Sequence, residues 1–165
     1  MSIHKLSEMV GEALKCSSST LSVAESCTGG FISHLITLIP GSSKYYLGGV
    51  TSYAISVKEK VLRVPAGIIK ERGVVSSEVA AAMAEGVRRL TGSTFSVSTT
   101  GLAGPGGDEN NSEGTVWIGI SGPQGTDTVK FLNTGCREEN IREFAAKALS
   151  ELFGYISRSL NLPSE

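Results

Sequence analysis

Short β-rich segments alternate with segments whose apolar residues recur at helical spacing, and this alternation limits the possible folds more than any other feature. Strands are expected over 20–24, 45–54 and 94–100, and helices over 3–15, 28–39, 56–64, 66–72 and about 76–90. The stretches 115–121 and 126–133 flank the turn GPQG and predict a hairpin, and a last helix is expected over about 137–160. The pattern indicates an α/β fold: a three-layer sandwich with a mixed β-sheet flanked by helices, Rossmann-like.

Length and composition narrow the class of protein. The 165 residues are expected to form one domain over 1–165. A net charge of −1 argues against partners held by bulk charge, such as nucleic acid or an anionic membrane. Three cysteines without paired spacing, no membrane-length apolar run and no signal-peptide core at the amino terminus predict a cytoplasmic protein.

Three small-residue segments mark the expected site, because ligands of such folds bind outside the carboxyl ends of the strands. They are AESCTGG (24–30), GSSKYY (41–46) and TTGLAGPGGD (99–108). Their glycines and helix-terminal amides suit a polar, anionic small molecule, although AESCTGG is also compatible with a packed turn in which Ser26 or Thr28 caps the next helix. The loop 101–114 is long enough to suggest a function.

Lysine is the expected base if the protein performs nucleophilic chemistry. His4 and His34 do not suit a Ser-His-Asp triad, no G-x-S-x-G occurs, and the His and Cys clusters of a zinc site are missing from the sequence. Lys58 would have to be neutral to act, and at its ordinary pKa only about one lysine in a few thousand is neutral at pH 7. Burial or a second cationic group would have to lower that pKa, and the hydroxyl of Tyr53 could relay the proton. The alternative is that Lys58 and Lys60 are solvated charges on a short helix.

The segments AESCTGG, PGSSKYYLGGVTSYAISVK, TTGLAGPGG and EGTVWIG, in this order, resemble the carboxy-terminal domain family of the competence/damage-inducible protein CinA. The resemblance extends from about Leu6 to Tyr155. Stand-alone members of the family are amidohydrolases of the pyridine nucleotide cycle, which deamidate nicotinamide mononucleotide (NMN) to nicotinic acid mononucleotide and ammonia. The resemblance therefore implies an NMN amidase that needs no metal or cofactor and that assembles as a dimer or higher homo-oligomer.

The resemblance also implies roles for particular residues. Ser43 matches the nucleophilic serine, and Tyr53 and Lys58 match the residues that deprotonate it, while Ser26 stays open as an alternative nucleophile. The expected substrate-binding residues are Ser26, Thr28, Gly41, Thr100, Gly101 and Arg137.

Two departures and two rival functions accompany this prediction. The family often has polar Ser and Asn where this chain has Ala54 and Ile55, which bears on substrate affinity or rate. The chain could instead be a nucleotide-binding or partner-binding module with little turnover. It could also be an amidase for another carboxamide.

Overall fold

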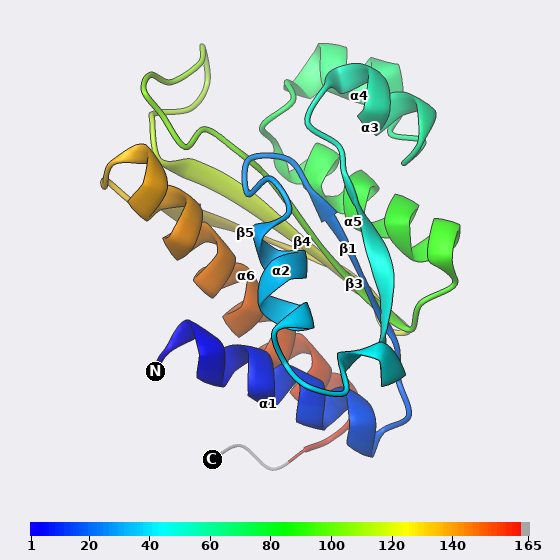
Figure 1. Ribbon diagram of the computed structural model, residues 1–165. Coiled ribbons are helices and arrows are strands. Elements are labelled where there is room, and N and C mark those ends of the chain that lie inside the picture. The colour runs from blue at the N-terminus through cyan, green and yellow to red at the C-terminus, as the bar shows by residue number, and fades with distance from the viewer. Residues whose placement is uncertain (163–165) are drawn as a thin grey trace.

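Five strands form one sheet in the computed structural model, which describes residues 1–162 (Figure 1). The strands are β1 (Leu21–Glu25), β2 (Tyr46–Thr51), β3 (Phe95–Gly101), β4 (Thr115–Gly122) and β5 (Gly125–Leu132). The helices are α1 (Ile3–Cys16), α2 (Phe31–Thr37), α3 (Ile55–Lys60), α4 (Ala66–Arg72), α5 (Ser77–Thr91) and α6 (Arg137–Ser159), with a 3₁₀ turn, η1 (Ser42–Lys44).

The sheet is mixed and has helices on both faces. Its strand order is β2-β1-β3-β4-β5, in which β2, β1 and β3 run parallel and β4 and β5 are antiparallel. Val23 of β1 packs in the core with residues of α1, α2 and α6, whereas the next residue, Ala24, packs with residues of α5. Figure 1 shows α5 on the other side of the sheet from α1, α2 and α6. This arrangement confirms the predicted three-layer α/β fold. None of the helices within residues 1–162 is long and apolar enough to cross a membrane.

The structure shortens three expected elements and adds one. The helix expected over 56–64 is α3, which ends at Lys60. Helix α2 begins at Phe31, not at 28, because Gly29 and Gly30 have φ values of +60° and +99°, which belong to a turn. The strand expected over 45–54 is confined to β2, and the turn η1 before it was not predicted. The predicted limits of α5 are confirmed: Ser76 caps its first turn and Gly92, at φ +73°, ends it.

The turn between β1 and α2 is built around the carboxylate of Glu25, which is only 1% exposed. Its Oε2 accepts from the Thr28 hydroxyl at 2.6 Å and from the amides of Gly30 and Ile32 at 3.2 and 3.0 Å. Its Oε1 accepts from the amide and the hydroxyl of Ser33, both at 2.9 Å. Glu25 thereby satisfies amides at the start of α2, where the helix dipole also favours a negative charge. The side chain that caps this helix thus comes from the preceding strand.

Replacing Glu25 by Ala is expected to destabilise the fold by about 3 kcal/mol or more, because several buried donors lose their acceptor together. Urea unfolding of the two proteins measures the difference. Glu143→Ala, on an exposed position of α6, is the matched control and should change stability by less than about 0.5 kcal/mol. A loss of less than about 1 kcal/mol for Glu25→Ala would mean that the turn keeps its shape without the carboxylate.

Helix α3 begins without a side-chain cap. Its N-cap residue is Ala54, whose φ of −79° and ψ of 147° are those of a normal capping residue, but its methyl group cannot accept a hydrogen bond. A serine at this position, as the resemblance leads one to expect, would supply an acceptor. With Ala54 there, the first turn of α3 has no side-chain cap.

Supplying a cap with Ala54→Ser is expected to raise the free energy of unfolding by about 1 kcal/mol. Thermal or urea unfolding would detect it. A valine at the same position offers no acceptor either and should not raise the free energy of unfolding. An unchanged stability for Ala54→Ser would show that the start of α3 is satisfied by solvent.

Candidate active site

The candidate site lies at the carboxyl ends of β1 and β3, which is the topological switch point of the sheet. From β1 the chain crosses to β2 on one side, and from β2 it returns past β1 to β3 on the other, so the connections diverge at this point. A cavity of about 270 Å³ opens there. Its walls come from four parts of the chain: Ser26–Cys27, the Tyr53–Lys58 segment with Ile55, Val74–Val75, and the loop 100–106 together with Arg137.

Lys58 is the most unusual residue of the cavity, because its side chain is only 1% exposed. Its Nζ lies 2.9 Å from Ser26 Oγ and donates to the backbone carbonyls of Ser52 and Tyr53. No carboxylate of residues 1–162 lies within ion-pair distance of this ammonium group. Lys58 is therefore a buried cation held by neutral oxygens.

Burial lowers the pKa of Lys58 to about 8, because the charged form loses hydration and gains no opposite charge in return. At that pKa roughly one molecule in ten carries a neutral lysine at pH 7, against one in a few thousand at the ordinary value. The prediction of a lysine with a lowered pKa agrees with the structure, and the solvated alternative for Lys58 does not.

The hydrogen bonds of Lys58 determine what its neutral amine can do. A neutral amine has two N–H groups and one lone pair, and the carbonyls of Ser52 and Tyr53 are acceptors only. When these carbonyls hold the two N–H groups, the lone pair is left facing Ser26 Oγ. The charged ammonium donates a hydrogen bond to Ser26 Oγ. In the neutral form, the Lys58 nitrogen can accept the Ser26 proton across the same contact.

Ser26 is fixed from two sides. Its backbone amide donates to Thr99 O of β3 at 3.0 Å, and the preceding residue is Glu25, whose carboxylate holds the turn. The side chain is 9% exposed and lines the cavity. The serine hydroxyl is thus placed between a titratable lysine and open space, as an activated nucleophile requires.

Tyr53 and Arg137 meet at the mouth of the cavity. Arg137 Nη2 lies 3.2 Å from the Tyr53 hydroxyl, and Nη1 donates to Gly104 O. The carbonyl of Tyr53, and not its hydroxyl, contacts Lys58. Tyr53 therefore lies at the site, as predicted, but its hydroxyl accepts a hydrogen bond from Arg137. The contacts do not support a proton relay from this hydroxyl to Lys58.

Thr100 and Gly101 line the cavity, as predicted, and each also has a structural role. The Thr100 hydroxyl donates to Val74 O at 2.8 Å, which fixes the segment before α5. A Cβ on Gly101 would lie 2.6 Å from Thr115 O, so only glycine allows β3 and β4 to approach this closely.

Ser43 does not lie beside Lys58. It belongs to η1, just before the amino end of β2, whereas Lys58 follows the carboxyl end of the same strand. Residues Tyr46 and Thr51 pair with the two opposite ends of β1, and a strand of six residues extends about 16 Å. Within one chain, the prediction that Lys58 deprotonates Ser43 is therefore wrong, and Ser26, the alternative, is the serine that contacts Lys58.

Two predicted substrate-binding residues lie away from the cavity. Gly41, at φ +83°, precedes η1 at the same remote end of β2 as Ser43. Thr28 is buried and donates to Glu25, with a second contact to the Thr99 hydroxyl at 2.8 Å. Thr28 supports the turn instead of facing a ligand.

Two residues that shape the site, Glu25 and Ser52, were not predicted from the sequence. Glu25 is the acid that ends the apolar run 21–24, and a carboxylate in the last position of a strand before two glycines and a helix is the pattern that could have revealed it. Ser52 contributes a carbonyl, which no sequence pattern encodes. Cys27 lines the cavity, but burial raises the pKa of its thiol to about 12, so it is not a thiolate nucleophile.

Acidic, histidine and cysteine side chains do not gather into a metal-binding group of three anywhere in residues 1–162. The polar groups around the cavity are instead one amine, one guanidinium, hydroxyls and backbone carbonyls. This set suits hydrogen bonding to an organic substrate with polar and anionic groups.

Comparison with known proteins identifies relatives over nearly the whole chain. The profile of the CinA C-terminal domain family matches residues 3–156. A CinA-like protein from Desulfotalea psychrophila is 49% identical over 143 residues, which cover 86% of this chain and 34% of that protein. A CinA-like protein from Salinibacter ruber is 45% identical over 147 residues, covering 88% and 36%. The chain spans about a third of the length of these curated relatives.

Solved structures share the fold. Competence damage-inducible protein A from Klebsiella pneumoniae superposes with a TM-score of 0.92 at 28% identity, over 95% of this chain and 98% of that one. A competence-damaged protein (CinA) superfamily protein from Escherichia coli gives 0.91 at 28% identity, over 93% and 90%. The family profile and the shared fold together show that this chain belongs to the CinA C-terminal domain family.

Proposed function

We propose that this chain is an amidohydrolase that deamidates nicotinamide mononucleotide to nicotinic acid mononucleotide and ammonia, with Ser26 as nucleophile and Lys58 as base. One observation carries the proposal: a buried lysine without a carboxylate partner lies 2.9 Å from a serine hydroxyl that faces a cavity. The substrate is inferred from the family resemblance, and the reaction class from the geometry.

The first half of the reaction forms an ester. Neutral Lys58 takes the Ser26 proton while Ser26 Oγ attacks the carboxamide carbon, so a C–O bond forms and the carbonyl oxygen becomes an oxyanion. When the tetrahedral intermediate collapses, the C–N bond breaks, and Lys58 returns its proton to the departing nitrogen, which leaves as ammonia. The amine is neutral again at the end of this step.

The second half reverses these roles with water. Lys58 removes a proton from a water molecule, whose oxygen attacks the ester carbon, and the bond to Ser26 Oγ breaks as Lys58 returns the proton to the serine. The products are the carboxylic acid and the free enzyme. The two carbonyls that bind Lys58 keep its nitrogen in place for both halves.

We infer that an amide of the loop after β3, which lines the cavity, is the donor for the oxyanion. Ala103 O accepts from Asn140, and since the C=O and N–H of one trans peptide point in opposite directions, the Gly104 amide faces away from α6. Leu102 N and Gly106 N already donate to Thr115 and Glu113. The Gly104 amide is therefore the donor favoured for this role, and one such donor contributes about 3–4 kcal/mol in other enzymes.

Replacing Ser26 by Ala is expected to reduce ammonia release from NMN by about 10³-fold or more, because the attacking oxygen is removed. Ser43→Ala, at the far end of β2, is the matched control and should keep nearly full activity. Assays with chelator present throughout, with chromatographic detection of nicotinic acid mononucleotide, measure both variants.

The opposite result would overturn the assignment of the nucleophile. If Ser43→Ala abolished turnover and Ser26→Ala only reduced it, the nucleophile would have to come from Ser43 of another copy of the chain. If the wild type bound NMN, seen as a raised melting temperature, but released no ammonia, the chain would be a binding module instead of an enzyme.

Activity is expected to increase with pH, because only neutral Lys58 accepts the Ser26 proton and its pKa is about 8. Below pH 7, kcat/KM should fall about tenfold per pH unit, and it should reach a plateau near pH 9. Lys58→Met should reduce the activity by at least about 10³-fold. Lys60→Met, at an exposed position of the same helix, should leave the activity nearly unchanged. A flat profile from pH 6 to 9 would contradict the role of Lys58.

A further inference from the structure

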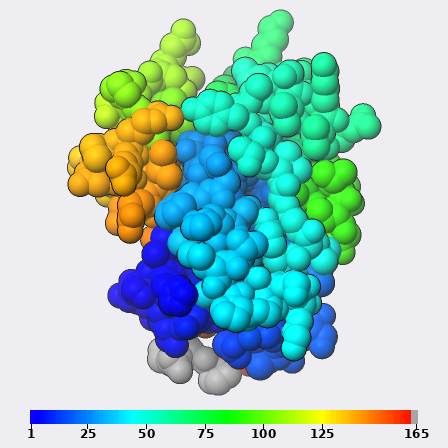
Figure 2. Space-filling view, viewed as in Figure 1, coloured from blue at the N-terminus to red at the C-terminus, as the bar shows by residue number. Residues whose placement is uncertain are grey.

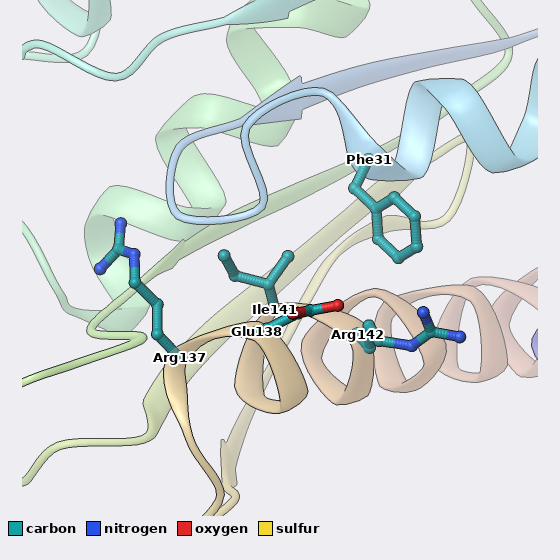
Figure 3. Close-up of a pocket in the computed structure, with 5 residues that line it drawn as sticks. All are labelled: Phe31, Arg137, Glu138, Ile141 and Arg142. Atoms are coloured by element: carbon teal, nitrogen blue, oxygen red, sulfur yellow. The ribbon is translucent and has the colours of Figure 1, made fainter.

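A second hollow adjoins the reaction cavity at the start of α6. It has a volume of about 410 Å³ and is lined by five residues: Phe31, Arg137, Glu138, Ile141 and Arg142. Figure 3 shows Phe31 projecting from the beginning of α2 toward α6, and Ile141 projecting from α6 toward the turn before α2. The hollow therefore lies between these two helices, whose surfaces adjoin in Figure 2 (α2 light blue, α6 orange).

Arg137 lines both cavities and links them. The reaction cavity, at about 270 Å³, falls below the roughly 300–1,000 Å³ of typical small-molecule sites. A carboxamide ring fits the space beside Ser26, but a ligand as large as a nucleotide must extend out of it. The hollow beyond Arg137 provides the continuation.

The lining of the hollow indicates which part of a ligand it would take. Phe31 and Ile141 are half-buried and give it an apolar floor. Arg142 is exposed and has no acid within ion-pair distance among residues 1–162, and the same holds for Arg137. Glu138 is the one acid in the lining, so the two arginines leave a net positive charge.

Arginine side chains without an acidic partner suit a phosphoryl group, because the planar guanidinium can donate two parallel hydrogen bonds to its oxygens. Figure 3 shows the side chains of Arg137 and Arg142 extending in different directions from α6, so a ligand that passes Arg137 meets a second cation further along the helix. Glu138 opposes an anion in the same space, which makes it a useful probe of the sign of the charge.

We propose that this hollow binds the phosphoryl end of the substrate and that Arg142 determines the preference for a phosphorylated over an unphosphorylated nucleoside. The inference rests on the proposed function for the chemistry at Ser26. It adds that the ring and the phosphoryl group occupy separate cavities, with Arg137 between them and the sugar over Phe31 and Ile141.

The test compares NMN with nicotinamide riboside, which lacks the phosphoryl group, in the wild type and in Arg142→Gln. We expect the variant to raise KM for NMN about tenfold, with kcat nearly unchanged, and to change KM for the riboside no more than twofold. Arg142→Lys should fall between the two, and Glu138→Gln should lower KM for NMN. Arg89→Gln, on α5 at the opposite face of the sheet, is the matched control.

Equal effects of Arg142→Gln on NMN and on the riboside, or no effect on either, would overturn the proposal while leaving the amidase function intact. If the wild type released no ammonia from either compound, the proposed function would fail instead. Calorimetric binding of NMN and of ribose 5-phosphate still tests the hollow in that case. A weaker affinity for both in Arg142→Gln, and not in Arg89→Gln, supports the phosphoryl site, and an unchanged affinity excludes it.

Discussion

The buried carboxylate of Glu25 is the group on which the geometry of the site depends. It accepts five hydrogen bonds from the turn and the first residues of α2, and two of the donors, the Thr28 hydroxyl and the Ile32 amide, are buried away from water. Because Ser26 is the next residue, the direction in which its hydroxyl leaves the sheet is set by this carboxylate. The Glu25 carboxylate thus holds the turn that carries the proposed nucleophile.

The chemistry of Lys58 depends on its burial without an acidic partner. A buried ammonium group without an acid destabilises the folded protein, and the sheet and its two layers of helices must compensate for this cost. A carboxylate beside Lys58 would relieve it, but would also hold the amine in its charged form. The two carbonyls of Ser52 and Tyr53 orient the nitrogen without adding a charge, so the site keeps a lysine that can lose its proton near neutral pH.

Much of the fold could be predicted from the sequence, because strand and helix periodicity and the caps Ser76 and Gly92 are local signals. The general position of the site could be predicted for the same reason, since carboxyl ends of parallel strands meet at one edge. The error at Ser43 has a different origin. The assignment of Ser43 rests on its match to a family segment, but Ser43 and Lys58 flank the same strand, so an extended β2 separates them. Contacts made by carbonyls, such as Ser52 O, depend only on the folded backbone.

The connection between β3 and β4 is far longer than the sheet requires. Two antiparallel neighbours can be joined by a turn of two residues, yet here the chain uses 102–114. The surplus length carries Leu102–Gly106 along the reaction cavity and contributes little to the core. Gly104 and Gly106 have φ values of +98° and +92°, which side chains rarely adopt, so this wall of the cavity can change its residues only where the backbone is not in such a conformation.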